Sequence, residues 1–228
     1  MLNCARAVAQ AELSASKASL DAAAPRGGAE PRGADLLSDW ERRLELTPSA
    51  LTTREPILAL RRATYAALGA RDAAAYTWLA QAKLCRASGH HGAAQLALLE
   101  ARSALEAVTG GDARANAGRG AGRPAPGMAL AVEQAKLLWA TGRQHRATVE
   151  IQEALDDSAL RGADPLTTSR AMLRLARWSA ATGQRSKQDV LNIYSNVLRD
   201  QKHTEKANFH VAKYMDDLLK DAARREQQ

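Results

Sequence analysis

The sequence predicts an all-α protein made of helical hairpins stacked into an α-solenoid. Of its 228 residues, 46% are hydrophobic but only 4% are aromatic, and alanine supplies much of the apolar fraction. Ala, Leu, Arg, Gln and Glu are strong helix formers, whereas the β-branched and aromatic residues that favour strands are scarce. A third observation is an internal repeat with the period of a helical hairpin.

The N-terminal part predicts a helix followed by a linker. Residues 2–23 have a helical pattern, and the Pro/Gly-rich stretch at 24–34 cannot hold a helix. We therefore expect residues 1–34 to lie outside the repeat region. From Asp35 a stronger pattern begins, with its apolar residues close to one helical face: Leu37, Trp40, Leu44 and Leu46.

A further helix is predicted to begin at Pro56. Proline is well tolerated in the first turn, because its missing N–H would have no helical partner there. Apolar and small residues then recur at intervals of three or four, which predicts the buried face of this helix: Ile57, Leu60, Thr64 and Leu68.

The same periodicity predicts seven more helices, separated by short turns. They cover residues 73–87, 92–108, 128–140, 144–156, 168–181, 187–198 and 204–225. Residues 109–127 are dense in Gly, Ala, Arg and Pro and have no apolar period, so we expect a flexible insertion there. Residues 35–225 are thus predicted to form one helical repeat region with a single insertion.

Self-comparison of the chain explains the turns. "AKLCRASGHHGAAQLALLEA" from Ala82 aligns with "AKLLWATGRQHRATVEIQEA" from Ala135. "ARWSAATGQ" from Ala176 repeats the first half, and "AKYMDDL" from Ala212 repeats the opening. These starts lie 53, 41 and 36 residues apart. Without the insertion of about 17 residues the first interval becomes about 36, which is typical of TPR-like helical-hairpin repeats.

The repeat gives the glycines one shared role. Gly89, Gly142 and Gly183 are predicted to be left-handed caps at the corners of the hairpins. Ala87 and Ala140 lie two residues before the first two corners, and we expect them, like Ala181 before the third, to allow close helix packing.

Three tryptophans fall within the repeated helices, at Trp78, Trp139 and Trp178. A ligand platform is conceivable, but we interpret each as a contact between packed helices. Trp178 is aligned with Leu84 and Leu137, and all three are predicted to point inward.

No motif in the chain predicts catalysis, a cofactor site or a metal site. The adjacent pair His90-His91 suggests metal ligation, but neighbouring side chains on a helix point about 100° apart and rarely bind one ion. "GRGAGRP" lacks the lysine and the preceding strand of a phosphate-binding loop, and no GxSxG elbow occurs. Cys4 and Cys85 lack CxxC spacing, so we expect free thiols in a reducing compartment.

The charge and hydropathy limit the classes of partner. The formal net charge is +7, and the arginines are spread along the helical segments without interleaved aromatic residues. A solvated surface is the simpler interpretation, so direct nucleic-acid binding is not expected. The chain has no run of about 20 apolar residues and no secretory signal, so we expect a soluble intracellular protein without membrane contact.

Several collinear blocks resemble the FAT region of ATR-type checkpoint kinases, which belong to the phosphatidylinositol 3-kinase-related kinase family. The most specific block is "EPILALRRA", which begins at Glu55. It is supported by "ASGHH" from Ala87 and "HVAKYMDDL" from His210, and the resemblance covers about residues 35–220 in order. The insertion at 109–127 departs from the usual spacing of the family.

The resemblance implies a non-catalytic TPR-like scaffold that supports the kinase domain of a parent protein. The parent of such a region phosphorylates Ser or Thr followed by Gln in the nucleus, during DNA damage and replication-stress signalling, with ATP and magnesium. Its partners would be the kinase domain, the neighbouring solenoid and adaptor proteins. The chain itself contains no kinase motif and is expected to be inactive alone. A free-standing TPR-like adaptor and a truncated gene model of the kinase are the alternatives.

Overall fold

The computed structural model describes residues 39–40, 42–67, 71–109, 126–199 and 204–226. Within these ranges all regular secondary structure is helical, as predicted. The chain divides into two compact units, Met1–Arg123 and Pro124–Gln228. The predicted N-terminal helix and linker, and nearly all of the predicted insertion, lie outside the described residues.

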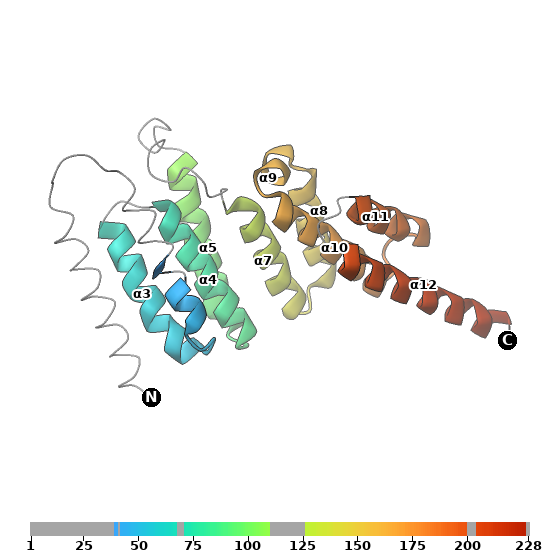
Figure 1. Cartoon of the computed structure of the whole chain (residues 1–228), viewed down its shortest axis with the longest axis horizontal. Coiled ribbons are helices and arrows are strands. Elements are labelled where there is room, and N and C mark those ends of the chain that lie inside the picture. The colour runs from blue at the N-terminus through green and yellow to red at the C-terminus, as the bar shows by residue number, and fades with distance from the viewer. Residues whose placement is uncertain (1–38, 41, 68–70, 110–125, 200–203, 227–228) are drawn as a thin grey trace. The chain divides into compact units, whose positions relative to one another are not determined.

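The described part of the first unit contains three long helices, which Figure 1 labels α3, α4 and α5. Their bounds are Leu51–Ala67, Arg71–Ala87 and His91–Thr109. A shorter helical stretch precedes them at 39–46, apart from residue 41. Helices α4 and α5 form a hairpin, and α3 packs against α4.

Helix α3 corrects the predicted start at Pro56. The helix begins five residues earlier, at Leu51, with Pro56 inside it. The backbone carbonyl of Ala50 accepts hydrogen bonds from the N–H groups of Thr53 and Arg54, and so caps the first turn. Pro56 is still close enough to the N-terminus that its ring disturbs only the carbonyl of the first turn.

The buried face of α3 also differs from the prediction. Its buried residues are Ile57, Leu58, Arg61 and Tyr65. Leu60 and Thr64 are only partly buried, because the face that meets α4 is rotated by about one residue. Arg61 can occupy the buried face in place of an apolar residue because its guanidinium donates to the Trp40 carbonyl.

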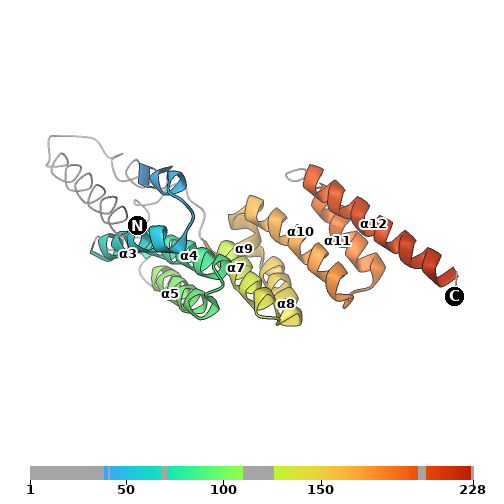
Figure 2. The ribbon, with the colours of Figure 1, turned by 90° about the horizontal axis from the view of Figure 1, so that it is seen from below.

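Among the described residues of the second unit, six helices follow one another along the chain. Figures 1 and 2 show α7 with α8, and α10 with α11, as hairpins that stack in chain order, with α12 packed last. Their bounds are Gly127–Ala140, Gln144–Asp156, Ser158–Ala163, Pro165–Thr182, Lys187–Arg199 and Thr204–Glu226 for α7 to α12. This succession of hairpins is an α-solenoid.

The short helix α9 was not predicted, because six residues are too few to show a period. The Asp157 carboxylate caps it by accepting hydrogen bonds from two backbone N–H groups, at 2.8 and 3.3 Å. Leu160 of α9 lies so close to Gly127 that a Cβ there would come within 2.6 Å of it. Helix α9 therefore covers the start of α7.

Two apolar clusters hold the second unit together. The first joins α7, α8 and α10 and contains Met128, Val132, Ala135, Ile151, Ala154, Leu155, Ala171 and Leu175. The second joins α10, α11 and α12 and contains Leu173, Ala176, Val190, Tyr194, Val197 and Ala207. Helix α10 contributes to both clusters, so each hairpin is buried by its neighbours. None of the helices in the described ranges is long and apolar enough to cross a membrane.

Candidate helix-packing interface

The corners of the first two hairpins have the same backbone geometry. Gly89 and Gly142 have φ angles of +79° and +82°. At the first corner, the N–H groups of Gly89 and His90 donate to the carbonyls of Arg86 and Cys85, at 3.1 and 2.8 Å. The second corner repeats both bonds from Gly142 and Arg143, at 3.1 and 2.9 Å. This paired pattern is the Schellman motif, which satisfies the last carbonyls of the helix.

The third corner uses a simpler cap. Gly183 has a φ of +63°, and its N–H donates to the Ser179 carbonyl at 3.1 Å. A single bond of this kind is the αL motif. Ser186 then starts α11: its hydroxyl accepts from the backbone N–H of Asp189 at 3.1 Å and donates to the Asp189 carboxylate at 2.6 Å.

The alanines that bring the helices together are not those predicted. Ala87 and Ala140 are exposed, and so is Ala181. The fully buried alanines at aligned positions of the repeat are Ala82, Ala135 and Ala176 in the first helices of the hairpins and Ala94 and Ala147 in the second helices, all 0% exposed. Ala87 and Ala140 end α4 and α7, and Ala181 lies one residue before the end of α10, so all three stand at the exposed corners.

The tryptophans in the repeated helices lie where one helix meets another. Trp139 of α7 and Trp178 of α10 stack nearly parallel, with ring centroids 4.4 Å apart and an interplanar angle of 8°. The Arg174 guanidinium lies 5.7 Å from the Trp178 centroid. In the first unit, the Arg62 guanidinium of α3 lies 4.0 Å above the Trp78 ring of α4. Stacked rings and cation–π contacts of this kind fix the spacing of adjacent helices.

A buried arginine joins the helical stretch at 39–46 to α3, and sequence reasoning missed it. Arg61 is 3% exposed, and its guanidinium donates to the Trp40 carbonyl. The same guanidinium lies 5.4 Å from the Trp40 ring centroid, and Trp40 packs at a tilt on Tyr65 at 5.6 Å. Tyr65, one turn after Arg61, is a local sequence signal for this contact, whereas Trp40 lies 21 positions away.

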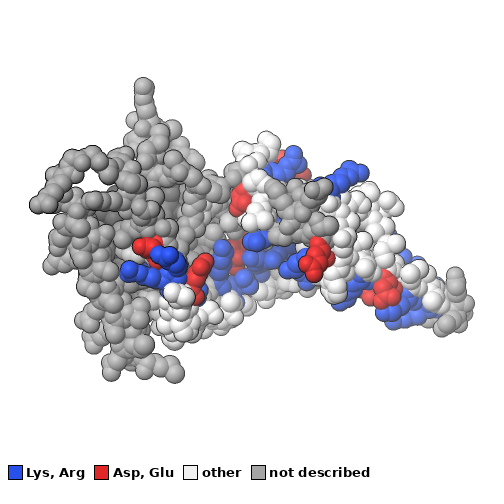
Figure 3. Space-filling view, in the orientation of Figure 1, with Lys and Arg blue, Asp and Glu red and all other residues white. Residues whose placement is uncertain are grey.

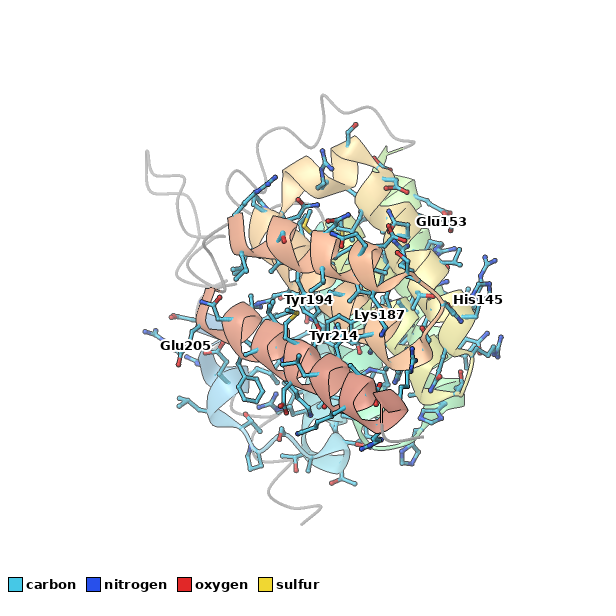
Figure 4. All side chains as sticks on the ribbon, turned by 90° about the vertical axis from the view of Figure 1, so that its right-hand side faces the viewer. His145, Glu153, Lys187, Tyr194, Glu205 and Tyr214 are labelled. Atoms are coloured by element: carbon cyan, nitrogen blue, oxygen red, sulfur yellow. The ribbon has the colours of Figure 1, made fainter. Side chains whose placement is uncertain are left out.

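A pair of tyrosines joins the last two helices. Tyr194 of α11 and Tyr214 of α12 lie 5.9 Å apart between centroids, and Figure 4 shows them between the two helices. Burial raises the pKa of both phenols. Each tyrosine therefore stays neutral and acts as an apolar packing group with a polar tip.

The histidine pair at the first corner has a structural setting. His90 is exposed and its Nδ1 lies 3.0 Å from the Ser88 carbonyl, whereas His91 is half-buried as the first residue of α5. Cys85, one turn earlier, is 1% exposed. Burial, followed by the nearby Glu55 carboxylate, raises the pKa of its thiol, which keeps it protonated and poorly nucleophilic.

A small hollow lies where α8 meets the turn between α10 and α11. Its volume is about 240 Å³. The Gln184 side-chain oxygen lies 3.2 Å from His145 Nδ1 and accepts from the Thr148 hydroxyl at 3.3 Å. Arg185 donates to Gln152 at 2.9 Å. These bonds tie the third corner to the preceding hairpin.

The arrangement supports helix packing. Among the described residues, no group of three or more His, Cys, Asp or Glu side chains is placed to hold a metal ion. The features described above are glycine caps, buried alanines and stacked tryptophan rings. Their shared effect is to fix the geometry between neighbouring helices.

The sequence profile of the FAT domain family matches residues 11–228. The Arabidopsis thaliana serine/threonine-protein kinase ATR is 32% identical over 221 residues, which cover 84% of this chain and 7% of that protein. The ATR proteins of Oryza sativa subsp. indica and subsp. japonica are each 32% identical over 231 residues, covering 89% of this chain and 8% of theirs. The chain thus spans less than a tenth of the length of these relatives. No solved structure matches it significantly.

Proposed function

The chain belongs to the FAT domain family, and from this premise we propose that it is a non-catalytic helical scaffold segment of an ATR-like serine/threonine protein kinase. The observation that carries the proposal is the collinear identity of 32% with ATR over 84% of the chain. The stacked hairpins of the second unit support it, because neighbouring hairpins there share apolar clusters through α10.

The finer parts of the proposal concern the parent protein. The parent would phosphorylate Ser or Thr followed by Gln, with ATP and magnesium, in nuclear DNA damage and replication-stress signalling. The segment would contact the parent's kinase domain, its neighbouring TPR-like solenoid and adaptor proteins. Its own contribution would be mechanical: fixed helix spacing holds the contact surfaces of the parent in place.

A chimaera tests the scaffold role. The matched segment of Arabidopsis thaliana ATR is replaced by residues 11–228 of this chain, and phosphorylation of a Ser-Gln substrate is measured after replication stress. We expect the chimaera to retain activity, and a second chimaera with Gly142→Val and Gly183→Val to lose it, because both corners require left-handed backbone. A first chimaera that accumulates normally but is inactive would contradict the proposal.

Two further measurements separate the alternatives. The purified chain should show helical circular dichroism without magnesium-dependent ATP turnover, and activity that survives purification would refute a non-catalytic role. Full-length transcript sequencing should place this segment upstream of a kinase segment in the same reading frame. A transcript without such a segment would favour the free-standing adaptor.

A further inference from the structure

Two positions of the repeat mark the side on which a first helix meets the second helix of its hairpin. One is the alanine that opens the aligned motif, and the other lies three residues earlier. Both positions are buried in α4, α7 and α10: Ala82 with Leu79, Ala135 with Val132, and Ala176 with Leu173. In α7 and α10 they share apolar clusters with residues of the second helices, α8 and α11.

The same side of α12 is open. The aligned alanine, Ala212, is exposed, and Phe209, three residues before it, is 64% exposed. Met215, three residues after it, is 44% exposed, although its counterparts Cys85 and Ser179 are buried. Helix α12 therefore presents to solvent the positions that first helices bury against a second helix.

A different side of α12 holds the helix in the second unit. Ala207 is buried in the cluster shared with α10 and α11, and Val211 and Tyr214 pack against that cluster. With 3.6 residues per turn, these three residues lie about 100° around the helix from the open side. Figure 2 shows α12 as the last helix of the second unit, with α10 and α11 on one side of it.

Helix α12 also continues past the position of the hairpin corner. The other hairpins turn there at a glycine with positive φ: Gly89, Gly142 and Gly183. Helix α12 instead has Leu219, which is 69% exposed, and continues to Glu226. Leu219 and the exposed Ala222 therefore lengthen the open side. We name this surface the α12 face: Phe209, Ala212, Met215, Leu219 and Ala222.

The second helices of the hairpins show what covers such a surface. Their buried residues recur at i, i+4 and i+7: Ala94, Leu98 and Ala101 in α5, Ala147, Ile151 and Ala154 in α8, and Val190, Tyr194 and Val197 in α11. Met215, Leu219 and Ala222 have the same spacing. Helix α12 therefore carries both the open side of a first helix and the apolar spacing of a second helix.

We propose that the α12 face binds the α12 face of a second copy of this chain, with the two helices antiparallel. A two-fold axis between residues 215 and 216 sets Phe209 opposite Ala222 and Ala212 opposite Leu219. Each large side chain thus meets a small one, as close packing requires. This inference rests on the repeat and does not depend on the parent protein.

The charges of α12 suit a second copy. Figure 3 shows acidic and basic side chains mixed along α12, so two copies of the helix do not meet as surfaces of one sign. The two-fold axis also brings Lys213 of one copy near Asp216 of the other, beside the ion pair that Asp216 makes with Lys220 at 2.5 Å. A single helix pair buries less than the roughly 800 Å² per partner of a standard interface, so we expect micromolar affinity.

Sedimentation velocity of the full chain, at about 1 to 200 µM, measures the dimer. Phe209→Glu with Leu219→Glu should weaken dimerisation at least about tenfold, because it places unpaired charges in the apolar contact. The matched control is Leu96→Glu with Leu99→Glu on α5, where both leucines are more than half exposed. It makes the same change in net charge and should weaken the dimer less than about threefold.

A cysteine cross-link tests the antiparallel register. In a chain with Cys4→Ser and Cys85→Ser, Met215→Cys should form a disulfide-linked dimer under mild oxidation, because the two copies of residue 215 lie beside the axis. Serine is compatible with the place of Cys85, since Ser179 occupies it in α10. Lys206→Cys is the control on the same helix, because its two copies would lie about 28 Å apart and should not cross-link.

The outcomes are distinct. The proposal is overturned if the chain stays monomeric over the whole concentration range, which would leave the α12 face to a helix of another protein. It is also overturned if the α5 pair weakens the dimer as much as the α12 pair, or if cysteines at 206 and 215 cross-link equally. If the glutamate variant loses helicity at 222 nm, Phe209→Gln with Leu219→Gln replaces it, with the same expected ranking against Leu96→Gln with Leu99→Gln.

Discussion

Replacing Gly142 by valine should destabilise the second unit through the backbone alone. Gly142 has a φ of +82°, a region that side chains with a Cβ rarely adopt. No atom lies within 4 Å of the place where a Cβ would stand, so no clash adds to the cost. A left-handed conformation costs an L-residue about 1–2 kcal/mol, and a β-branched residue lies at the upper end.

The assay is thermal unfolding followed by circular dichroism at 222 nm. For a unit of about 100 residues, a loss of 1–2 kcal/mol lowers the melting temperature by at least about 4 °C. Gly142→Asn should cost clearly less than Gly142→Val, because asparagine tolerates the left-handed region.

Gly162→Ala is the matched control, since Gly162 lies in α9 with equally open space and without a positive φ. Alanine there should leave stability unchanged or raise it by up to about 1 kcal/mol. Equal effects of valine and asparagine at Gly142, or a melting temperature unchanged by valine, would refute the proposed cap.

Three other substitutions test the packing. Arg61→Ala should cost at least about 2 kcal/mol in urea unfolding, because it removes a buried charged donor to the Trp40 carbonyl, and a loss below about 0.5 kcal/mol would argue against that contact. Ser179→Ala should raise stability by about 1 kcal/mol, because the Ser179 hydroxyl is buried and finds no hydrogen-bond partner among the described residues; a loss would show that it has one. Partial burial acts to raise the pKa of Asp164, but hydrogen bonds from Thr167 and Leu166 outweigh it and lower the pKa below 3.8. The ionised Asp164 carboxylate therefore contributes its full stabilisation above pH 3.8 and loses it as the pH falls further. Asp164→Asn should flatten the acid unfolding curve below that pH, and an unchanged curve would contradict this.

The ends of the helices were largely set by local sequence. The predicted helix at 144–156 has the observed bounds of α8, and the other predicted boundaries of the second unit differ from the observed ones by at most a few residues. Gly142 shows why: a residue without a Cβ and a preceding amphipathic run define a corner without help from the rest of the chain. Pro56 shows the limit of local sequence signals. Helix α3 begins before it, at Leu51, and the Ala50 carbonyl accepts hydrogen bonds from the first turn.

Which face of each helix is buried was decided by its neighbours. Apolar spacing on α3 favoured Leu60 and Thr64, but packing against α4 and Trp40 selected Leu58 and Arg61. A helix of period 3.6 has several nearly equivalent stripes, and only the partner helix chooses one.

The contacts between hairpins needed the tertiary structure for the same reason. Sequence alone identified the helical hairpins, their glycine corners and the family resemblance, all of which depend on local conformation and residue order. The stacking of Trp139 on Trp178 joins residues from helices far apart in the chain. Such pairs depend on the angle and register at which the hairpins meet, and these are fixed by the packing of buried alanines such as Ala135 and Ala176.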